Sequence, residues 1–352
     1  ASSNFDSHGF TVHPVFMCQP PHKKRLWADV PFRALLPKGL ERVLVTGLGV
    51  SAHRDALPVI RMQADVQNQG YAAGYAAAVS ALTDTDLRAL DLRAIQQHLE
   101  EIEILPDRAL TDEDTFPVGD AALHHACTDG IRDLKGLAII FNEPERALPV
   151  LREQFASACG AEDRLHLALI LALLGDGSGK EILHETVRQS EWDDGWNFTG
   201  MGQFGMSLSP LDVSLIALGK TGDAGSWPTI LAKTESLPVD PEFSHCRAVV
   251  EACEALYPRY PDSRVAAALA ALLRSDGISG HAQQTLEAAQ NAVTEDPCQT
   301  LPRNRALREL HLARGLYRCG DDKGLGERVL QEYTRDLRSH FARHAQAVLQ
   351  LS

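Results

Sequence analysis

The pattern of hydrophobic and polar positions changes about a third of the way along the chain. In the first part, residues 42–46 form an apolar, β-branched run that Gly47 ends, which predicts a buried strand entering a tight turn. Residues 86–105 carry leucine and isoleucine at three- to five-residue steps, which predicts an amphipathic helix stopped by a proline. Residues 107–118 are polar and contain a late proline, so we expect them to link two domains.

An alanine-rich stretch over residues 64–82 predicts a helix with one very small face. Gly70 and Gly74 lie four residues apart, and Ala73 and Ala77 repeat that spacing. Such a face allows a ligand or another backbone to approach closely. Tight packing of the helix against a sheet is the alternative explanation.

After residue 119 the chain contains no convincing strands, and helices recur between similar turns. The turn glycines are separated by 47, 55 and 43 residues, and they are Gly175, Gly222, Gly277 and Gly320. A repeated unit of helix, Gly-Asp turn and helix at this spacing is close to the period of HEAT repeats, which predicts an all-α solenoid. An unrelated helical bundle is the alternative.

Residues 191–210 interrupt this pattern with two tryptophans, two phenylalanines and two methionines among glycines. Long irregular segments of this kind are often functional. We expect the segment to pack on the other domain or at a substrate entrance, or else to fold back on its own helices.

Composition and charge exclude some classes of function. Hydrophobic residues make up 44% of the chain and charged residues 23%, as in soluble globular proteins. The net charge of -13 argues against a general binder of nucleic acid or of anionic membranes, which needs a basic field. No apolar run reaches the roughly 18 residues of a membrane-spanning helix.

The cysteines and the first residues bear on compartment and processing. The 7 cysteines are scattered and form no CxxC pair, so we expect buried thiols rather than a disulfide framework, and a reducing compartment such as the cytoplasm. The chain begins Ala-Ser-Ser-Asn, which is expected of a processed chain, a clipped chain or one subunit of a split protein.

One region resembles a known family. It comprises residues 30–47 (VPFRALLPKGLERVLVTG), the pair Ser51 and Ala52, residues 60–62 (IRM), residues 69–74 (QGYAAG) and the helical tail 90–99 (LDLRAIQQHL). In this order and spacing, the region resembles the end of the FAD-binding domain of bacterial FAD-dependent oxidoreductases, relatives of the glutathione-reductase-type and fumarate-reductase-type flavoproteins. The resemblance covers roughly residues 28–106.

The resemblance implies FAD as cofactor and a set of flavin-contacting positions. Thr46, Gly47 and Leu48 would pass close to the ribityl-phosphate chain, where glycine permits main-chain approach. Arg61 would face the isoalloxazine or a substrate carboxylate. The helix that begins near Gln63 would direct its N-terminal N–H groups at the flavin, where they would stabilise negative charge. The remaining implied cofactor-binding residues are Gln69, Gly70, Ala73 and Gly74.

The sequence departs from the family pattern in three ways. Leu48 stands where the family usually has arginine or aspartate, so the resemblance implies only a backbone contact to the ribityl chain there. Asp65 would repel a reduced flavin unless it points to substrate or to an arginine. No GxGxxG motif follows a strand, so the dinucleotide-binding unit for the ADP half of FAD is not in this sequence. We therefore expect a companion polypeptide to carry that Rossmann-type half.

Histidines near the start of the chain have three interpretations. His8, His13, Cys18 and His22 have a spacing that is not a standard zinc pattern. His8 or His13 is a candidate catalytic base, because oxidation of a substrate by flavin needs an acceptor for the departing proton. Ordinary structural histidines are the third interpretation, and we predict no metal site.

A polar pair follows the glycine turn. His53 and Arg54 occupy positions where the family has threonine and histidine, so either residue would contact substrate. A salt bridge of Arg54 with Asp55 or Glu41 is the alternative.

These features predict an α/β remainder of an FAD-binding domain over residues 1–110, followed by an all-α HEAT-like domain over residues 119–352. The first functional hypothesis is an FAD-dependent oxidoreductase, completed by a companion chain, that removes hydride from a small organic or sugar-like substrate. The second is a HEAT-type scaffold or assembly subunit whose flavin domain is degenerate. Neither hypothesis involves nucleic acid or a membrane span.

Overall fold

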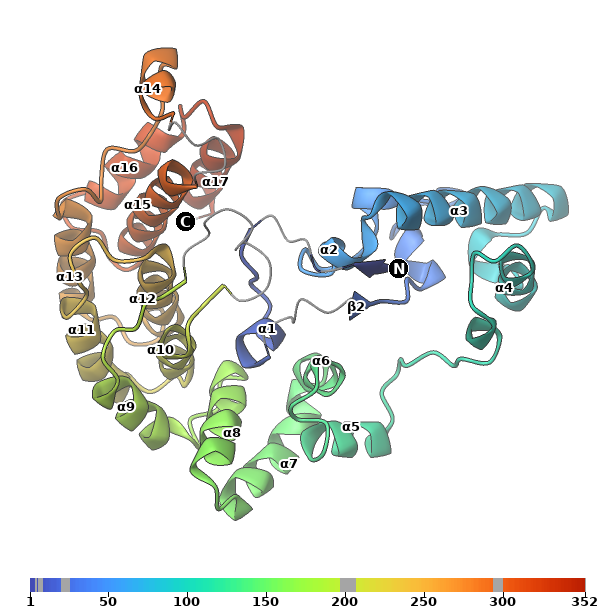
Figure 1. Cartoon of the computed structure of the whole chain (residues 1–352), viewed down its shortest axis with the longest axis horizontal. Coiled ribbons are helices and arrows are strands. Elements are labelled where there is room, and N and C mark those ends of the chain that lie inside the picture. Colours follow the sequence, from blue (N-terminus) through green and yellow to red (C-terminus); the bar gives the residue numbers. More distant parts are fainter. Residues whose placement is uncertain (4, 6–8, 20–25, 197–206, 294–299, 352) are drawn as a thin grey trace. The chain divides into compact units, whose positions relative to one another are not determined.

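The computed structural model of the 352-residue chain describes all residues except 4, 6–8, 20–25, 197–206, 294–299 and 352. The described chain is mostly helical and divides into two compact units (Figure 1). Unit 1 comprises Ala1–Val12 and Pro21–Gly119, and unit 2 comprises His13–Pro20 and Asp120–Ser352. The short segment His13–Pro20 thus packs with unit 2, although its neighbours on both sides in sequence belong to unit 1. That segment was predicted to belong to the first domain.

Unit 1 contains one long helix, several short helical turns and a minimal sheet. The antiparallel strands pair Ser2 with Trp27 and Ser3 with Leu26. The elements of unit 1 are β1 (Ser2–Ser3), β2 (Leu26–Trp27), η1 (Phe32–Leu35), η2 (Gly47–Gly49), α2 (Leu57–Ile60), α3 (Gln63–Thr83), η3 (Leu87–Ala89), α4 (Leu92–Glu101) and η4 (Asp107–Leu110).

The alanine-rich helix predicted over residues 64–82 is confirmed as α3, but the helix predicted over residues 86–105 is shorter than expected. It begins only at α4, because Asp91 caps it by accepting hydrogen bonds from the backbone N–H groups of Arg93 (3.0 Å) and Ala94 (3.2 Å). Leu90, just before the cap, has an extended backbone. Apolar side chains from both helices and from η3 form the core of unit 1, and they are Ala76, Leu87, Leu90, Ile95 and Leu99.

The strand predicted over residues 42–46 is wrong. These residues have no regular secondary structure, Arg42 has a positive φ of 56°, and the backbone N–H of Val45 donates to Leu35 O (2.8 Å) in a loop. A β-branched run forms a strand only where a neighbouring strand offers ladder hydrogen bonds. Within the described part of the chain, β1 and β2 pair only with each other.

The predicted linker over residues 107–118 is partly structured. It begins with η4, and the guanidinium of Arg108 donates to Asp29 (2.8 Å). Arg93 on α4 donates to the carbonyl oxygens of Ala109 (2.7 Å) and Asp112 (2.8 Å). These contacts tie the first half of the linker to unit 1.

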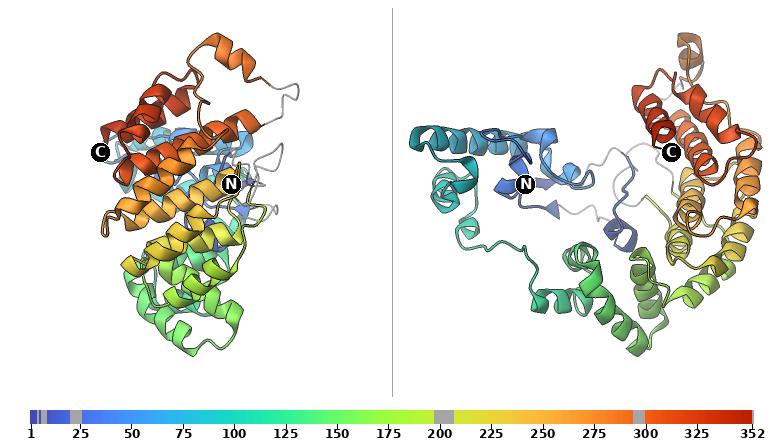
Figure 2. Two further views of the ribbon diagram at one scale, coloured as in Figure 1. Left: turned by 90° about the vertical axis from the view of Figure 1, so that its left-hand side faces the viewer. Right: turned by 180° about the vertical axis from the view of Figure 1, so that it is seen from behind.

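Unit 2 is built of helices stacked in two rows. One row contains α8, α10, α12 and α15 in succession, and α9, α11 and α13 form the other row (Figures 1 and 2). The elements are α1 (Val15–Cys18), α5 (Asp120–Cys127), α6 (Leu134–Asn142), α7 (Pro144–Ser157), α8 (Ala161–Leu173), α9 (Lys180–Gln189), α10 (Pro210–Lys220), η6 (Ala224–Ser226), α11 (Trp227–Glu235), α12 (Phe243–Leu256), α13 (Ser263–Arg274), α14 (Leu286–Asn291), α15 (Leu301–Arg318), α16 (Leu325–Tyr333) and α17 (Ser339–Gln350).

The helices predicted around the four turn glycines of unit 2 are confirmed, and the turns themselves show why glycine is needed. All four have positive φ, at 86° for Gly175, 68° for Gly222, 76° for Gly277 and 100° for Gly320. Glycine adopts this left-handed conformation without steric cost and commonly ends helices for that reason. The aspartates that follow support the next segment, since Asp176 accepts from Ser178 N (2.8 Å) and Asp321 from Gly326 N (2.8 Å).

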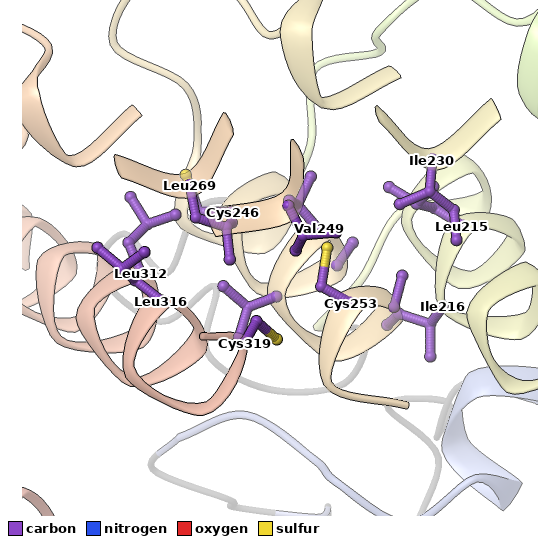
Figure 3. Packing of buried hydrophobic residues seen from close by; sticks show 14 of the residues in the cluster. Leu215, Ile216, Ile230, Cys246, Val249, Cys253, Leu269, Leu312, Leu316 and Cys319 are labelled. Atoms are coloured by element: carbon purple, nitrogen blue, oxygen red, sulfur yellow. The ribbon is translucent and has the colours of Figure 1, made fainter. Parts of the chain in front are cut away.

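The core of unit 2 runs through several helices without interruption. Figure 3 shows Leu215 and Ile216 on α10, Val249 and Cys253 on α12, and side chains of α13 and α15 packed together. As expected for buried thiols, the following cysteines are 0–1% exposed: Cys127, Cys246, Cys253 and Cys319. Burial raises the pKa of the Cys246 thiol to about 12, so this thiol stays protonated.

The described part of the aromatic segment, residues 191–196, folds back on its own helical unit. The indole N–H of Trp192 donates to Ser236 Oγ (3.2 Å), and the backbone N–H of Trp196 donates to Ser244 Oγ (2.8 Å). Of the two alternatives for this segment, these contacts correspond to the second. The remainder of it up to residue 206 lies outside the described residues.

Candidate functional site

The predicted flavin-contacting residues of unit 1 gather around the first turns of α3. Gly47 has a φ of 66°, and a Cβ atom added to it would lie 3.6 Å from Val66 Cγ1 on α3. Thr46 precedes this turn in extended conformation, and its side chain caps no N–H group of η2. The structure thus brings the glycine turn and the start of α3 together.

Leu48 projects into solvent from the same turn. Its side chain is 72% exposed. An apolar side chain offers a ribityl or phosphate group no hydrogen bond, so at position 48 only the backbone is suited to a polar ligand.

The entrance to α3 carries Arg61 and Gln63. Arg61 is half-buried, and its backbone N–H closes α2 on Leu57 O (3.1 Å). Gln63 is exposed and occupies the first helical position after Met62, which provides no side-chain cap. The first intrahelical hydrogen bond runs from Val66 N to Met62 O, so the N–H groups before it have no partner within the helix.

Asp65, which would repel a reduced flavin, points to the small sheet. Its Oδ2 accepts a hydrogen bond from the backbone N–H of Ser2 (3.4 Å) on β1. The carboxylate is thereby directed at a backbone donor of its own unit. The positive N-terminal end of the α3 dipole also stabilises its negative charge.

Gln69 is the buried polar residue of this region. Its side chain is 8% exposed, and Nε2 donates to Ile60 O (2.9 Å). Its Oε1 is buried and accepts no hydrogen bond from any described residue. Since an unpaired buried acceptor costs on the order of 1–3 kcal/mol, a donor from a ligand or another chain would stabilise this arrangement.

The small-residue face of α3 divides between core and surface. Ala73 is 7% exposed and faces inward, whereas Gly70 and Gly74 are exposed. A Cβ atom added at either glycine would meet nothing within 4 Å. The helix–sheet packing considered as an alternative is therefore absent among the described residues, and the glycine face is open.

An aromatic cluster borders this open face. The imidazole of His98 on α4 stacks on Tyr75 at 3.9 Å between centroids, and its Nε2 lies 3.0 Å from the hydroxyl of Tyr71. Sequence reasoning missed this cluster. Its only sequence signal is the spacing of the two tyrosines, four residues apart in an alanine-rich helix.

Neither predicted catalytic histidine is among the described residues of unit 1. His8 lies outside the described residues. His13 belongs to unit 2, where its ring meets Phe141 edge-on at 6.3 Å and its Nδ1 accepts from Val15 N (3.3 Å). Of the remaining residues of the early histidine pattern, His22 is also outside the described ranges.

The predicted salt bridge of Arg54 is present. Its Nε lies 3.4 Å from Asp55 Oδ1, and its guanidinium donates to Phe10 O (2.7 Å). Asp55 is 5% exposed and also accepts from Val12 N (2.7 Å), so this group ties residues 10–12 to the loop before α2.

Unit 2 contains a cavity away from these residues in sequence. The cavity, of about 550 Å³, lies between α11, α13 and residues 237–241, with mostly apolar walls and none of the predicted flavin-contacting residues. In the described ranges, no group of three or more His, Cys, Asp or Glu side chains is arranged to hold a metal ion. The described helices include none with both the length and the apolar character needed to cross a membrane.

Comparison with known proteins agrees with the resemblance seen in the sequence. Residues 4–99 match the model of a family described as FAD dependent oxidoreductase. No curated protein and no solved structure matches the chain. The matched family uses FAD, and the match therefore indicates FAD as cofactor and a flavin-dependent redox function for this segment, which covers under a third of the chain.

Proposed function

We propose that this chain is part of an FAD-dependent oxidoreductase whose flavin site is shared with a companion polypeptide. Unit 1 would contribute the last flavin-contacting segment, and the companion would contribute the Rossmann-type half that binds the ADP part of FAD. The observation that carries the proposal is the open glycine face of α3 within the segment that matches the family. A surface helix of a globular protein normally presents charged or polar side chains to solvent, whereas the exposed face of α3 carries Gly70, Gly74 and Ala77.

The residues of unit 1 fit a flavin in three respects. Gly47 combines a positive φ with free main-chain approach, Gly70 and Gly74 leave room beside α3, and Gln69 offers a buried acceptor without a donor among the described residues. The flavin carries N–H and C=O groups on its pyrimidine ring that such an acceptor and the free N–H groups of α3 are suited to bind. The Leu48 side chain contributes no polar contact to such a site.

The reaction we assign is hydride removal from a small organic or sugar-like substrate. Bound FAD supplies the two-electron acceptor. Arg61 would position a polar or anionic group of the substrate, or balance the negative charge that reduction brings to the site. His8 or His13 would take the proton that leaves the substrate. For His13 this would require Nδ1 to release the N–H of Val15.

Unit 2 would serve the complex as a HEAT-like solenoid that holds the companion or presents the substrate. Support for this role comes from the two stacked rows of helices and from the repeated glycine turns. Repeat arrays of this type commonly use extended surfaces to bind other proteins.

The test is a visible absorption spectrum of the natively purified protein with its companion chains. A two-banded flavin spectrum that bleaches when a substrate is added without oxygen would support the proposal. A colourless sample shown to contain every native partner would overturn it. That result would favour the alternative, in which the chain is a HEAT-type scaffold or assembly subunit with a degenerate flavin domain.

A further inference from the structure

A short strap lies against α11 and α12 of unit 2. We define it as residues 190–196, which have no helix or strand. At its start, the ammonium of Lys233 on α11 donates to Ser190 O (2.5 Å). At its end, the backbone N–H of Trp196 donates to Ser244 Oγ (2.8 Å) on α12. Since the strap has few backbone hydrogen bonds of its own, its position depends on side chains from the helices beneath it.

His245 on α12 lies at the centre of this contact. The residue is 1% exposed, and the ring of Trp192 from the strap covers it with a centroid distance of 4.5 Å. Its Nδ1 lies 2.7 Å from Asp212 Oδ1 on α10, and its Nε2 lies 3.0 Å from the carbonyl oxygen of Asp193 in the strap. The imidazole therefore joins α10 to the strap through both of its nitrogens.

The two hydrogen-bond partners of His245 determine how many protons its imidazole carries. A backbone carbonyl oxygen can only accept, so Nε2 must carry a hydrogen. Asp212 is 0% exposed, and its Oδ2 accepts from Ser209 N (2.9 Å) in the capping box of α10, where the helix dipole favours a carboxylate. With an ionised Asp212, Nδ1 must carry a hydrogen as well, and the ring is an imidazolium.

Loss of one proton breaks one of the two bonds. A neutral imidazole keeps a hydrogen on a single nitrogen, so a lone pair then faces either the carboxylate of Asp212 or the carbonyl oxygen of Asp193. Because Asp212 is completely buried, no water replaces a donor lost toward its carboxylate, so the neutral ring gives up the bond to the carbonyl oxygen of Asp193, which is only partly buried. The arrangement is therefore stable only with both nitrogens protonated.

We propose that protonated His245 is a latch that holds the strap onto α10, α11 and α12, and that its deprotonation releases the strap. The strap is fitted to this latch at Gly195. Gly195 has a φ of 61°, and a Cβ atom there would lie 2.9 Å from His245 Nε2 and 2.9 Å from Glu242 Cβ. Only glycine allows the backbone to pass this close to the ring.

The charges around the ring set the direction of the switch. Burial lowers the pKa of His245, but the hydrogen bond and charge of Asp212, together with Asp193, outweigh burial, and the pKa is raised overall. A raised folded-state pKa means that the latch is fully closed below the ordinary histidine pKa of about 6.5 and opens as pH rises through the folded value.

Two other charged groups face the latch. Lys233 lies over the Trp192 ring at 5.1 Å, and burial lowers the pKa of its ammonium, opposed by Glu191 and Asp193. Glu242 immediately precedes α12 and lies beside Gly195. Lys233 also releases its proton on the alkaline side, so a test must separate its titration from that of His245.

Hydrogen exchange of the strap, followed by mass spectrometry of the full chain from about pH 5.5 to 9 and corrected for intrinsic rates, tests the latch. Protection should fall by at least about tenfold as His245 deprotonates. In H245Q, protection should be low at every pH with no step, and in D212N the step should move to lower pH. H125Q, which changes an exposed histidine of α5, should match the parent protein.

Two results would overturn the latch. One is strap protection that stays constant over this range in the parent protein. The other is a step that persists in H245Q, which would assign the titration to Lys233. If H245Q fails to fold, the imidazole nitrogen shifts of His245 in the parent protein decide the matter. The latch requires two protonated nitrogens near pH 6, and a neutral tautomer there would refute it.

Discussion

The two units use the same kind of residue for opposite purposes. In unit 2, helical glycines lie against neighbouring helices: a Cβ atom at Gly219 on α10 would come within 2.5 Å of Ala252 O, and one at Gly315 on α15 within 2.9 Å of Val250 Cγ1. In unit 1, Gly70 and Gly74 on α3 would meet nothing within 4 Å. Glycine lowers the stability of a helix interior, so its presence within these three helices requires an explanation. In unit 2 the closely packed neighbouring helix explains each glycine, whereas no described residue of unit 1 explains Gly70 or Gly74.

The two units also differ in the extent of their buried cores. Leu215 in the core of unit 2 is 0% exposed and belongs to a cluster that spans most helices of the unit. The core of unit 1 is a smaller cluster around α3 and α4. Large apolar side chains are exposed in both units, among them Leu48 (72%) and Leu82 (87%) in unit 1 and Val239 (95%) and Leu286 (75%) in unit 2. The two units therefore differ in the extent of their buried cores and not in the presence of exposed apolar side chains.

The comparison of cores predicts the largest effect. Leu215→Ala should lower the free energy of unfolding by about 3 kcal/mol, because it removes buried contacts and leaves a cavity. The matched substitution in unit 1, Leu82→Ala, should change it by less than about 0.5 kcal/mol. Urea denaturation followed by circular dichroism measures both. Equal effects of the two substitutions would show that the contrast between the units is false.

The helices were predictable from sequence because their signals are local. Glycine turns act within a few residues, so the helix pairs flanking Gly175 and Gly320 could be located without the structure. The Asp91 cap is also a local signal, but it was missed, and the helix was predicted to begin too early. The strand over residues 42–46 failed because strand formation depends on a partner elsewhere. The HEAT-like assignment and the flavin roles of Arg61 and Gln63 stay predictions.

Parts of the candidate sites could not have been predicted at all. His245 and Asp212 are 33 residues apart and meet only when α10 and α12 pack together. The unpaired Oε1 of Gln69 depends on the burial of α3 against α2, which no periodicity reveals. The sequence did locate the glycine face, although which of its residues face the core became clear only in three dimensions.

A substitution of Arg61 tests whether this residue takes part in catalysis. With the companion chain present, Arg61→Ala should lower kcat/KM, or the rate of flavin reduction, by about 100-fold, the loss expected when one charge-stabilising donor is removed. Thermal unfolding should change little. Arg54→Ala is the control, since that guanidinium is engaged by Asp55 and Phe10 O. Unchanged turnover in Arg61→Ala would refute our placement of this residue.

Unit 2 should also lose stability in acid through His344 on α17. Burial, followed by the charges of Arg314 and Arg318, lowers the pKa of His344 to about 4, so the folded protein keeps it neutral. The unfolded chain binds this proton near pH 6.5, so stability falls as pH drops from about 6.5 to 4. Allowing for partial exposure, His344 should account for about 2 kcal/mol of that loss.

The measurement for His344 is the difference between urea unfolding free energies at about pH 7.5 and 4.5, before and after His344→Gln. The variant should lose less stability in acid than the parent protein, because glutamine has no proton to gain. His125→Gln, at an exposed position paired with Asp129, should leave the acid loss unchanged. An identical pH dependence in the parent protein and His344→Gln would contradict the prediction.

The smallest effect on stability is the most informative about function. Gly74→Ala should stabilise the isolated chain by up to about 1 kcal/mol, because alanine favours a helix and nothing stands within 4 Å of its Cβ. Gly219→Ala should do the opposite, since its Cβ would overlap the backbone of Ala252. If flavin or the companion chain approaches α3 at Gly74, however, flavin occupancy of the purified complex should fall in Gly74→Ala and be lost in Gly74→Val. A Gly74→Val complex that keeps full flavin occupancy would show that the flavin site is not completed at this face, because the added isopropyl group would then displace neither flavin nor companion chain.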